Sequence, residues 1–429
     1  MMAHARPPWG MLAILVVAAI LSFVDRQILS LLVEPIKRDL HIDDFAMGLL
    51  AGPAFAIFYA VAGIPLGWLA DRVDRGRLMA AGIAAWSIMT ALSGFAANFA
   101  HLFIARIGVG VGEATLGPAA HSIIADRFDK ARLPLAMSIY GTGVALGAGF
   151  AFALGGQVVA LASGPARALP LVGNLAPWQL TFVLVGLPGL LVALALALIV
   201  RDPRDRLVGA RPAPFAGLGD FWRSRRSLIL LYITGVSLLG AAGFANLLWL
   251  PSVFVRNFGW SAPQIGTVIG LMLMTLGVGG VLLCGVIATR IVRGGRSDGA
   301  LIVTAGAAIV SVPFAFSTLM PDATTTLLLV APGILVSSAY VGLGPAIVQA
   351  ATPPELRGRI AAFALMITGL LSMIVGPVGV GALTSLVFGD PHKVGLSLAI
   401  LSVIFYASGA ACLLAARGAY RGVIAAQSA

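Results

Sequence analysis

Long apolar runs with almost no charge recur along the whole chain, and they constrain its fold more than any other feature. Examples are the runs 11–24, 186–200 and 396–416, and about 20 apolar residues are enough for a helix to cross a bilayer. Of the 429 residues, 59% are hydrophobic and 10% are charged, against about 25% charged residues in soluble domains. Because a segment inside lipid must satisfy its own backbone hydrogen bonds, these runs predict membrane-spanning α-helices.

The first apolar run could be a cleaved secretory signal or a retained span. Arg6 followed by the run 11–24 resembles the charged and hydrophobic regions of a signal peptide. A cleavage site of small residues should follow such a peptide, but the chain continues with the polar segment 25–30. We therefore expect a retained first span.

The apolar runs fall into two groups of six, so twelve spans are expected. The basic segment 201–226, rich in Pro and Gly, separates the groups. The loop 67–76 after span 2 is matched by the loop 285–294 after span 8, with Gly, Arg, Arg and Gly aligned at one constant offset. We predict an all-α membrane protein of two six-helix bundles, residues 1–200 and 227–429, related by pseudo-two-fold symmetry.

The charge distribution predicts topology rather than a nucleic-acid-binding surface. The net charge of +11 is divided among short Lys and Arg clusters in alternate loops, which predicts cytoplasmic loops there and both termini in the cytoplasm. We expect a multi-pass monomer in the bacterial inner membrane. Cys284 and Cys412 lie inside apolar runs, so no disulfide framework or metal site is expected. No nucleophile and base pair has a plausible spacing, so we expect neither an enzyme nor a cofactor.

Four ionisable side chains interrupt the apolar runs at the depth of hydrocarbon. Asp25 and Arg26 lie in span 1, and Arg106 and Glu113 lie in span 4. Each such charge costs about 2.5–3.5 kcal/mol on insertion scales, so retained charges indicate a functional site. Two acids and two bases give zero net charge, which is the least costly way to bury four charges.

Helical periodicity places these charges on single faces. Asp25 and Arg26 share a polar stripe with Ser22 and Ser30, which should face the bundle interior. In span 4, Arg106 and Glu113 share a face with glycines, and this predicts room beside each charge. The glycines are Gly110 and Gly117.

Two interpretations of the charged cluster follow. The cluster could be a structural network that holds spans 1 and 4 together. Alternatively, Asp25 or Glu113 could change protonation during a transport cycle, because opening to water changes the balance between desolvation and the nearby arginines. Arg26 or Arg106 would then bind a carboxylate or phosphate head group, and the proton gradient would supply the energy.

Two motifs resemble those of the major facilitator superfamily. The segment 67–77 reads G-x3-D-R-x2-R-x-R, which resembles the signature loop between spans 2 and 3, and the segment 106–114 reads R-x3-G-x-G-x-A, which resembles the span 4 motif. The resemblance covers essentially the whole chain. It implies a secondary transporter with twelve helices.

Within that superfamily, the segments 23–30, 110–114 and 201–204 look like the Spinster subfamily. This resemblance implies proton coupling at Asp25 and Glu113, and animal members of the subfamily export lysolipids or phosphorylated sphingoid bases. Two features depart from the superfamily pattern. Thr289 replaces the acid in the second signature loop, and span 5 lacks the proline of antiporter motifs, so export and uptake both stay open.

The signature loop is expected to form a cytoplasmic gate. Asp71 can accept hydrogen bonds from a helix amino terminus, and Arg75 can pair with Asp126 at the inner end of span 4. The alternative is that the loop arginines only set topology, which leaves Asp71 without a role. The expected gate comprises Gly67, Asp71, Arg72, Arg75 and Asp126.

The second half carries only uncharged polar groups in the middle of its spans, such as Asn246 and Ser372. One charged wall and one mainly apolar wall suit an amphiphile with an ionic head. We therefore expect a proton-coupled transporter that works by alternating access. Its expected substrate is an amphiphile with an anionic or zwitterionic head, of the lysolipid or sphingoid kind. The expected partners are membrane lipids, protons and this substrate. The alternatives are proton symport of a small organic anion, such as a sugar acid or aromatic acid, and a non-transporting membrane receptor or lipid scaffold.

Overall fold

The structure is a computed structural model, and it describes residues 9–70, 72–129, 132–164, 175–200, 202, 218–353 and 356–428. Every regular element within these ranges is helical, which confirms the all-α prediction. The chain divides into two compact units, which are described separately.

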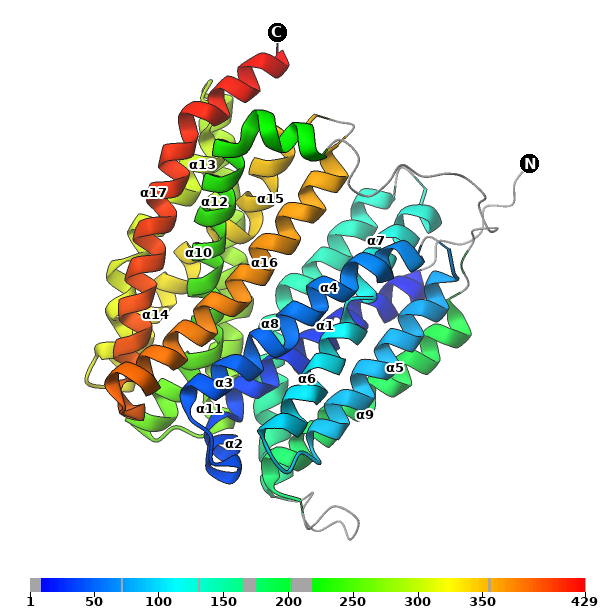
Figure 1. Ribbon diagram of the computed structural model, residues 1–429, viewed down its shortest axis with the longest axis vertical. Coiled ribbons are helices and arrows are strands. Elements are labelled where there is room, and N and C mark those ends of the chain that lie inside the picture. Colours follow the sequence, from blue (N-terminus) through cyan, green and yellow to red (C-terminus); the bar gives the residue numbers. More distant parts are fainter. Residues whose placement is uncertain are drawn as a thin grey trace. The chain divides into compact units, whose positions relative to one another are not determined.

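The first unit comprises the segments Met1–Ile42, Pro53–Gly209 and Ser261–Met274. In this unit α1 packs on α8 and α9, α5 packs on α6 and α9, α4 packs on α6, and α8 packs on α11 (Figure 1). Its helices are α1 (Trp9–Leu31), α2 (Val33–Leu40), α4 (Pro53–Ala70), α5 (Arg75–Ser93), α6 (Phe99–Glu113), α7 (Leu116–Arg127), α8 (Leu133–Ser163), α9 (Pro177–Ile199) and α11 (Ala262–Met272).

The second unit comprises Asp43–Gly52, Ala210–Trp260 and Thr275–Ala429. Here α10 packs on α16 and α17, α3 packs on α16, and α13 packs on α15 and α17 (Figure 1). Its α-helices are α3 (Asp44–Ala51), α10 (Leu218–Phe258), α12 (Val278–Arg293), α13 (Gly299–Ser311), α14 (Ala323–Ser337), α15 (Ala339–Ala351), α16 (Arg357–Ala382) and α17 (Val394–Ser428). Short π-helical or 3-10 turns cover Leu273–Gly277, Pro313–Leu319, Leu383–Phe388 and Pro391–Lys393.

The segment Asp43–Gly52 belongs to the second unit although it lies early in the sequence, because glycines let its backbone touch α16. A Cβ atom added at Gly48 would lie 2.8 Å from the carbonyl oxygen of Pro377, and one at Gly52 would lie 2.6 Å from that of Met373. Small residues spaced four apart are the usual means of such close helix packing in membranes. The division at residues 201–226 stays a prediction.

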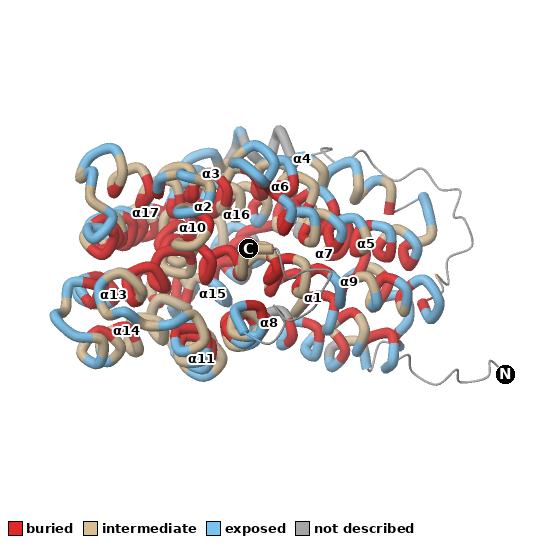
Figure 2. The backbone as a smooth tube through the Cα atoms, turned by 90° about the horizontal axis from the view of Figure 1, so that it is seen from below, coloured by how far each residue is buried: buried red, intermediate tan, exposed pale blue. Residues whose placement is uncertain are grey.

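Outward-facing side chains of the helices are apolar, as a membrane protein requires. On α9 the residues Leu187, Leu191, Leu194 and Leu198 form one exposed stripe, with 71% of Leu191 exposed. Figure 2 shows buried residues on the facing sides of the helices and exposed residues on the outer sides. Among the residues that the structure describes, eleven helical stretches are long and apolar enough to cross a membrane. The expected span 3 corresponds to α5, which has 19 residues and arginines in its first turn.

An ion-pair cluster joins the loop before α13 to the end of α17. Asp298 is 1% exposed, and its carboxylate accepts hydrogen bonds from Arg417 Nε at 2.9 Å and Arg421 Nε at 2.8 Å. Burial raises the pKa of Asp298, but the hydrogen bonds from the two arginines outweigh burial, so this pKa is lowered from its ordinary value.

We predict that Asp298→Asn lowers the melting temperature of the detergent-solubilised protein by a few degrees at pH 7. A lowered carboxyl pKa adds stability above the unfolded pKa of about 3.9, and this stability is lost as the pH falls through the folded pKa. The difference between variant and wild type should therefore shrink below about pH 4. Asp129→Asn, which alters an exposed pair with Arg132, is the control and should change little. An equal deficit at pH 3 and pH 7 would contradict the prediction.

Candidate functional site

The four charges expected in the membrane interior converge inside the first unit. Asp25 and Arg26 come from α1, and Arg106 and Glu113 come from α6. Asp25, Arg106 and Glu113 are at most 2% exposed, and the Arg26 side chain is 17% exposed. Because charge at this depth is expensive, the bonding of each group decides what the site can do.

Glu113 accepts hydrogen bonds from two side chains of α1. Ser22 Oγ donates a hydrogen bond of 2.7 Å to Glu113 Oε2, and Arg26 forms a short ion pair with the same oxygen. Ser22 and Arg26 are four residues apart, so they lie on one helical face. Glu113 is the last residue of α6, where the span breaks before α7 begins at Leu116. A donor hydroxyl and a guanidinium on one oxygen both favour the ionised form.

Asp25 and Arg106 are bonded differently. Arg106 NH1 donates to the backbone carbonyl oxygen of Asp25 at 3.1 Å. Within the described part of the chain, Asp25 Oδ1 and the Nε and NH2 atoms of Arg106 are buried without hydrogen-bond partners. Glu113 therefore has a salt bridge with Arg26, whereas Asp25 and Arg106 lie close together with no salt bridge recorded among the described residues.

Aromatic rings surround the arginines of this cluster. The Arg26 guanidinium lies 4.6 Å from the centroid of the Phe55 ring, 5.3 Å from that of Phe23 and 5.7 Å from that of Tyr59. The Arg106 guanidinium lies 5.6 Å from the centroid of the same Phe55 ring. Phe55 thus contacts both cations, and each contact contributes about 0.5–2 kcal/mol. Sequence analysis missed Phe55, because an aromatic residue in an apolar run has no distinguishing signal.

The room expected beside Gly110 is occupied by α4. A Cβ atom at Gly110 would lie 2.6 Å from the carbonyl oxygen of Phe55. The glycine therefore allows α4 to touch α6, and this contact brings the Phe55 ring to the arginines.

The residues of the expected cytoplasmic gate are only partly brought together. The Arg75 side chain is fully buried, and its NH1 donates to Asp126 at 2.7 Å and to Ser122 at 2.9 Å. Its Nε donates to Asp202 at 2.7 Å. Gly67 has open space around it. Arg72 is exposed and stacks on the Trp68 ring, and Asp71 lies outside the described residues.

Asp202 is a partner of Arg75 that sequence analysis missed. A Cβ atom at Gly76 would lie 2.6 Å from the carbonyl oxygen of Val200, so the start of α5 touches the end of α9 and brings Asp202 to Arg75. Burial lowers the pKa of Arg75, but the hydrogen bonds that it donates to Asp202 and Asp126 outweigh burial and raise this pKa. Arg75 therefore stays charged. The only sequence signal was the segment 201–204, which resembles a Spinster motif.

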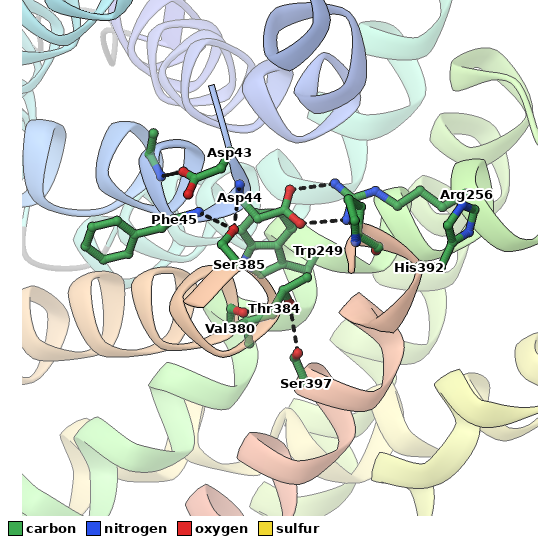
Figure 3. A network of polar contacts seen from close by, with 12 residues as sticks. Asp43, Asp44, Phe45, Trp249, Arg256, Val380, Thr384, Ser385, His392 and Ser397 are labelled. Atoms are coloured by element: carbon green, nitrogen blue, oxygen red, sulfur yellow. Dashed lines mark hydrogen bonds and ion pairs between the residues drawn. The ribbon is translucent and has the colours of Figure 1, made fainter. Parts of the chain in front are cut away.

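A second polar network, unexpected from the sequence, lies inside the second unit. Arg256 donates to both carboxylate oxygens of Asp44 at 2.7 and 2.8 Å and to the carbonyl oxygen of Pro391 at 2.8 Å. Ser385 Oγ accepts from the backbone N–H groups of Asp44 and Phe45 at the start of α3. Figure 3 shows these contacts around Asp44. Asp44 and Arg256 are at most 4% exposed as side chains, so this pair fastens α3 to the second unit.

Comparison with known proteins is consistent with a membrane transporter. The family model described as Major Facilitator Superfamily matches residues 15–377. An MFS-type efflux pump of Mycolicibacterium smegmatis is 29% identical over 419 residues, which are 97% of this chain and 94% of that protein. Protein spinster homolog 1 of Homo sapiens is 28% identical over 327 residues, which are 72% of this chain and 59% of that protein.

A solved structure shares the fold across nearly the whole chain. It is the crystal structure of a bacterial homolog to the human lysosomal transporter Spinster, in an inward-facing and unoccupied conformation. The TM-score is 0.83 at 24% identity, and the match covers 98% of each chain.

We predict that Phe55→Leu destabilises the protein by about 1–2 kcal/mol more than the same change at Phe152, because only Phe55 adds contacts with guanidinium groups to its buried area. Phe152 is equally buried in α8 and serves as the matched control. Unfolding in detergent, followed by circular dichroism, measures the difference. Equal losses for the two leucine variants would show that Phe55 only fills space.

We predict that Asp44→Asn and Arg256→Gln each lower the free energy of unfolding by about 3–5 kcal/mol, because each leaves a buried charge without its partner. The double variant should lose clearly less than the sum of the two single losses. A double-mutant cycle in thermal unfolding measures this coupling. Simple additivity would mean that the pair does not hold α3 in place.

Proposed function

The chain belongs to the Major Facilitator Superfamily and is a Spinster-like secondary transporter, and we propose that protons drive it. The expected family and fold class are confirmed by the matches to the family model and to the solved structure. The further proposal is that the substrate is amphiphilic, with an anionic or zwitterionic head group of the lysolipid or sphingoid kind.

The unequal bonding of the two acids carries the proton proposal. Glu113 accepts from Arg26 and Ser22 and stays ionised. Among the described residues each acid has one buried carboxylate oxygen with no hydrogen-bond partner, Asp25 Oδ1 and Glu113 Oε1, but only Glu113 has a salt bridge, so the charge of Asp25 is the less compensated of the two. We assign proton exchange to Asp25 and a fixed negative charge to Glu113. Two carboxyl groups in different environments commonly divide their roles in this way.

Protonation of Asp25 changes the net charge of the cluster from zero to positive. Arg106 then has no anionic neighbour except Glu113, which Arg26 already engages. The unpartnered Nε and NH2 atoms of Arg106 provide donors for a carboxylate or phosphate head group. Loss of the proton returns a carboxylate to Arg106 and competes with that head group. Proton binding and substrate binding therefore favour each other.

The spans of the second unit carry only uncharged polar side chains near their middle, and this is an argument for an amphiphilic substrate. Several of its mid-span polar side chains donate to backbone carbonyl oxygens within this unit, Asn246 to that of Ala242, Thr368 to that of Ala364 and Ser372 to that of Ser237. The charges for a head group come from the first unit, and an apolar tail needs no charged partner. The proposal is thus a substrate whose ionic end is recognised by Arg106 and Arg26.

The cluster around Arg75 is proposed as the cytoplasmic gate. Arg75 joins the start of α5 to Asp126 near the end of α7 and to Asp202 after α9. A movement of these helix ends has to break hydrogen bonds of a fully buried guanidinium. We place Gly67, Asp71 and Arg72 in the same gate. We also propose a monomer in the bacterial inner membrane with both termini cytoplasmic.

We predict that Asp25→Asn reduces gradient-driven transport at least tenfold, because an amide cannot exchange the coupled proton. The measurement uses proteoliposomes with an imposed pH gradient, a lysophospholipid as the probe and a pH dye inside the vesicles. Asp129→Asn, at an exposed acid, is the control and should behave like wild type. An Asp25→Asn protein with a normal response to the gradient would overturn the proposed role.

The same vesicles separate the substrate classes. A lysophospholipid should raise the melting temperature in a concentration-dependent way, since a ligand that binds only the folded state adds about 2.7 kcal/mol at a hundred times its Kd. Hexuronate and phthalate should not. Gradient-driven uptake of hexuronate or phthalate, without any effect of lysophospholipid, would establish a small organic anion as the substrate. Stabilisation by lysophospholipid without transport would indicate a receptor or lipid scaffold.

A further inference from the structure

The face of α5 that meets Asp25 carries two buried polar side chains that the proposed cycle does not yet use. Trp86 and Thr90 are four residues apart on α5, and they are at most 1% exposed. Both lie beside the Asp25 carboxyl, within reach of a side-chain hydrogen bond. Trp86 Nε1 and Thr90 Oγ1 are nevertheless without hydrogen-bond partners in the described part of the chain, as is Asp25 Oδ1.

Glycines fix Trp86 in this position. A Cβ atom at Gly112 would lie 2.8 Å from Cβ and from the backbone nitrogen of Trp86, so α5 touches α6 at this residue, one position before Glu113. On its other side, a Cβ atom at Gly189 of α9 would lie 3.9 Å from Trp86 Nε1. The indole is therefore held between two helix backbones, and its N–H has little freedom to find a partner other than Asp25.

Buried polar groups without partners are rare, because each loses its hydrogen bonds to water on burial. Here one acceptor, Asp25 Oδ1, and two donors, on Trp86 and Thr90, are all without partners. The two donors can bond to the Asp25 carboxylate when it carries a negative charge. Hydrogen bonds to a charged acceptor are shorter and about twice as strong as those between neutral groups.

We propose that Trp86 and Thr90 are positioning residues that close on the Asp25 carboxylate when it releases its proton. The two donors stabilise the anion relative to the acid, and this sets the pH at which the coupled proton leaves. The inference rests on the proposed function, in which Asp25 exchanges the proton. Neither residue touches a transported molecule in this role.

The charges around Asp25 do not provide these donors. Glu113 and Arg106 face it from α6, and Arg26 neighbours it on α1. Among the helices packed on α1, α8 carries only Tyr140 as an ionisable side chain, and α9 carries none. The ionisable side chains of α2 and α7, which also pack on α1, are Glu34, Lys37, Arg38, Asp39, His121, Asp126 and Arg127, and those of α5 are Arg75 and Arg77. Arg106 donates to the Asp25 backbone instead of to its carboxylate.

Infrared difference spectroscopy of the full-length protein in lipid tests the proposal without any substrate. The carboxylic-acid C=O band that disappears in Asp25→Asn is assigned to Asp25 and followed as a function of pH. Thr90→Val and Trp86→Phe each remove one donor and keep most of the shape. Each should move the midpoint of this band by about one pH unit to higher pH, since the carboxylate loses a hydrogen bond and holds its proton more tightly.

Two variants show whether donors or packing cause the shift. Thr90→Ser keeps a hydroxyl and should keep the wild-type midpoint. Ser87→Ala removes a buried hydroxyl from the same helix; this hydroxyl also lacks a partner in the described residues, but it lies against Gly189 rather than Asp25. It should leave the midpoint unchanged.

The outcomes distinguish this inference from the proposed function. A titrating Asp25 band whose midpoint stays put in both Thr90→Val and Trp86→Phe overturns the positioning role alone. A shift in Ser87→Ala as large as in Thr90→Val also overturns it, because packing would then explain both. Absence of any titrating Asp25 band in the wild type overturns the proton role of Asp25, and the inference falls with it.

Discussion

The ion pair between Arg26 and Glu113 is the interaction on which the rest of the site depends. Removing a charge from water costs several kcal/mol per ion even after relaxation, so neither group can stay ionised in a membrane bundle alone. Their pairing, the Ser22 hydroxyl and the Phe55 ring together offset that cost. In the proposed cycle Glu113 stays an anion, and it then sets the electrostatic environment of Asp25 and Arg106.

Because Arg26 and Glu113 form a salt bridge, their charges are compensated in a way that those of Asp25 and Arg106 are not. Arg26 and Glu113 neutralise each other, so the state of Asp25 decides whether the remainder of the cluster is neutral or positive. At low effective dielectric a single proton then changes the local potential strongly. A transporter needs such a difference between states, because a ligand shifts a conformational equilibrium only by its differential affinity. The asymmetry in hydrogen bonding is therefore more informative than the count of charges.

Sequence alone predicted the features that depend on local periodicity. Helices, their apolar faces, the convergence of Asp25, Arg26, Arg106 and Glu113, and the proximity of Arg75 to Asp126 all follow from residues that repeat on one face or flank known spans. It missed the partners that only chain packing can choose. Asp202 and Arg256 look like ordinary loop or span-end charges, and Phe55 looks like any apolar residue of a span. Which of these becomes buried against a charge depends on how closely two helices approach.

That distance is set by glycines. Gly110 and Gly117 suggested open room beside the charges, and the nearest atom to a Cβ at Gly117 is the Tyr59 hydroxyl oxygen at 4.0 Å, but Gly110 brings the backbone of α4 against α6, and Gly112 does the same for α5. The charges therefore lie in closely packed surroundings, where electrostatic interactions are stronger than in water. A side chain at Gly110 or Gly112 would push α4 or α5 away from α6, the helix whose Arg106 and Glu113 bond to α1 over 2.7–3.1 Å. The glycines thus act on function through the dielectric environment of the four charges, without bonding to any of them.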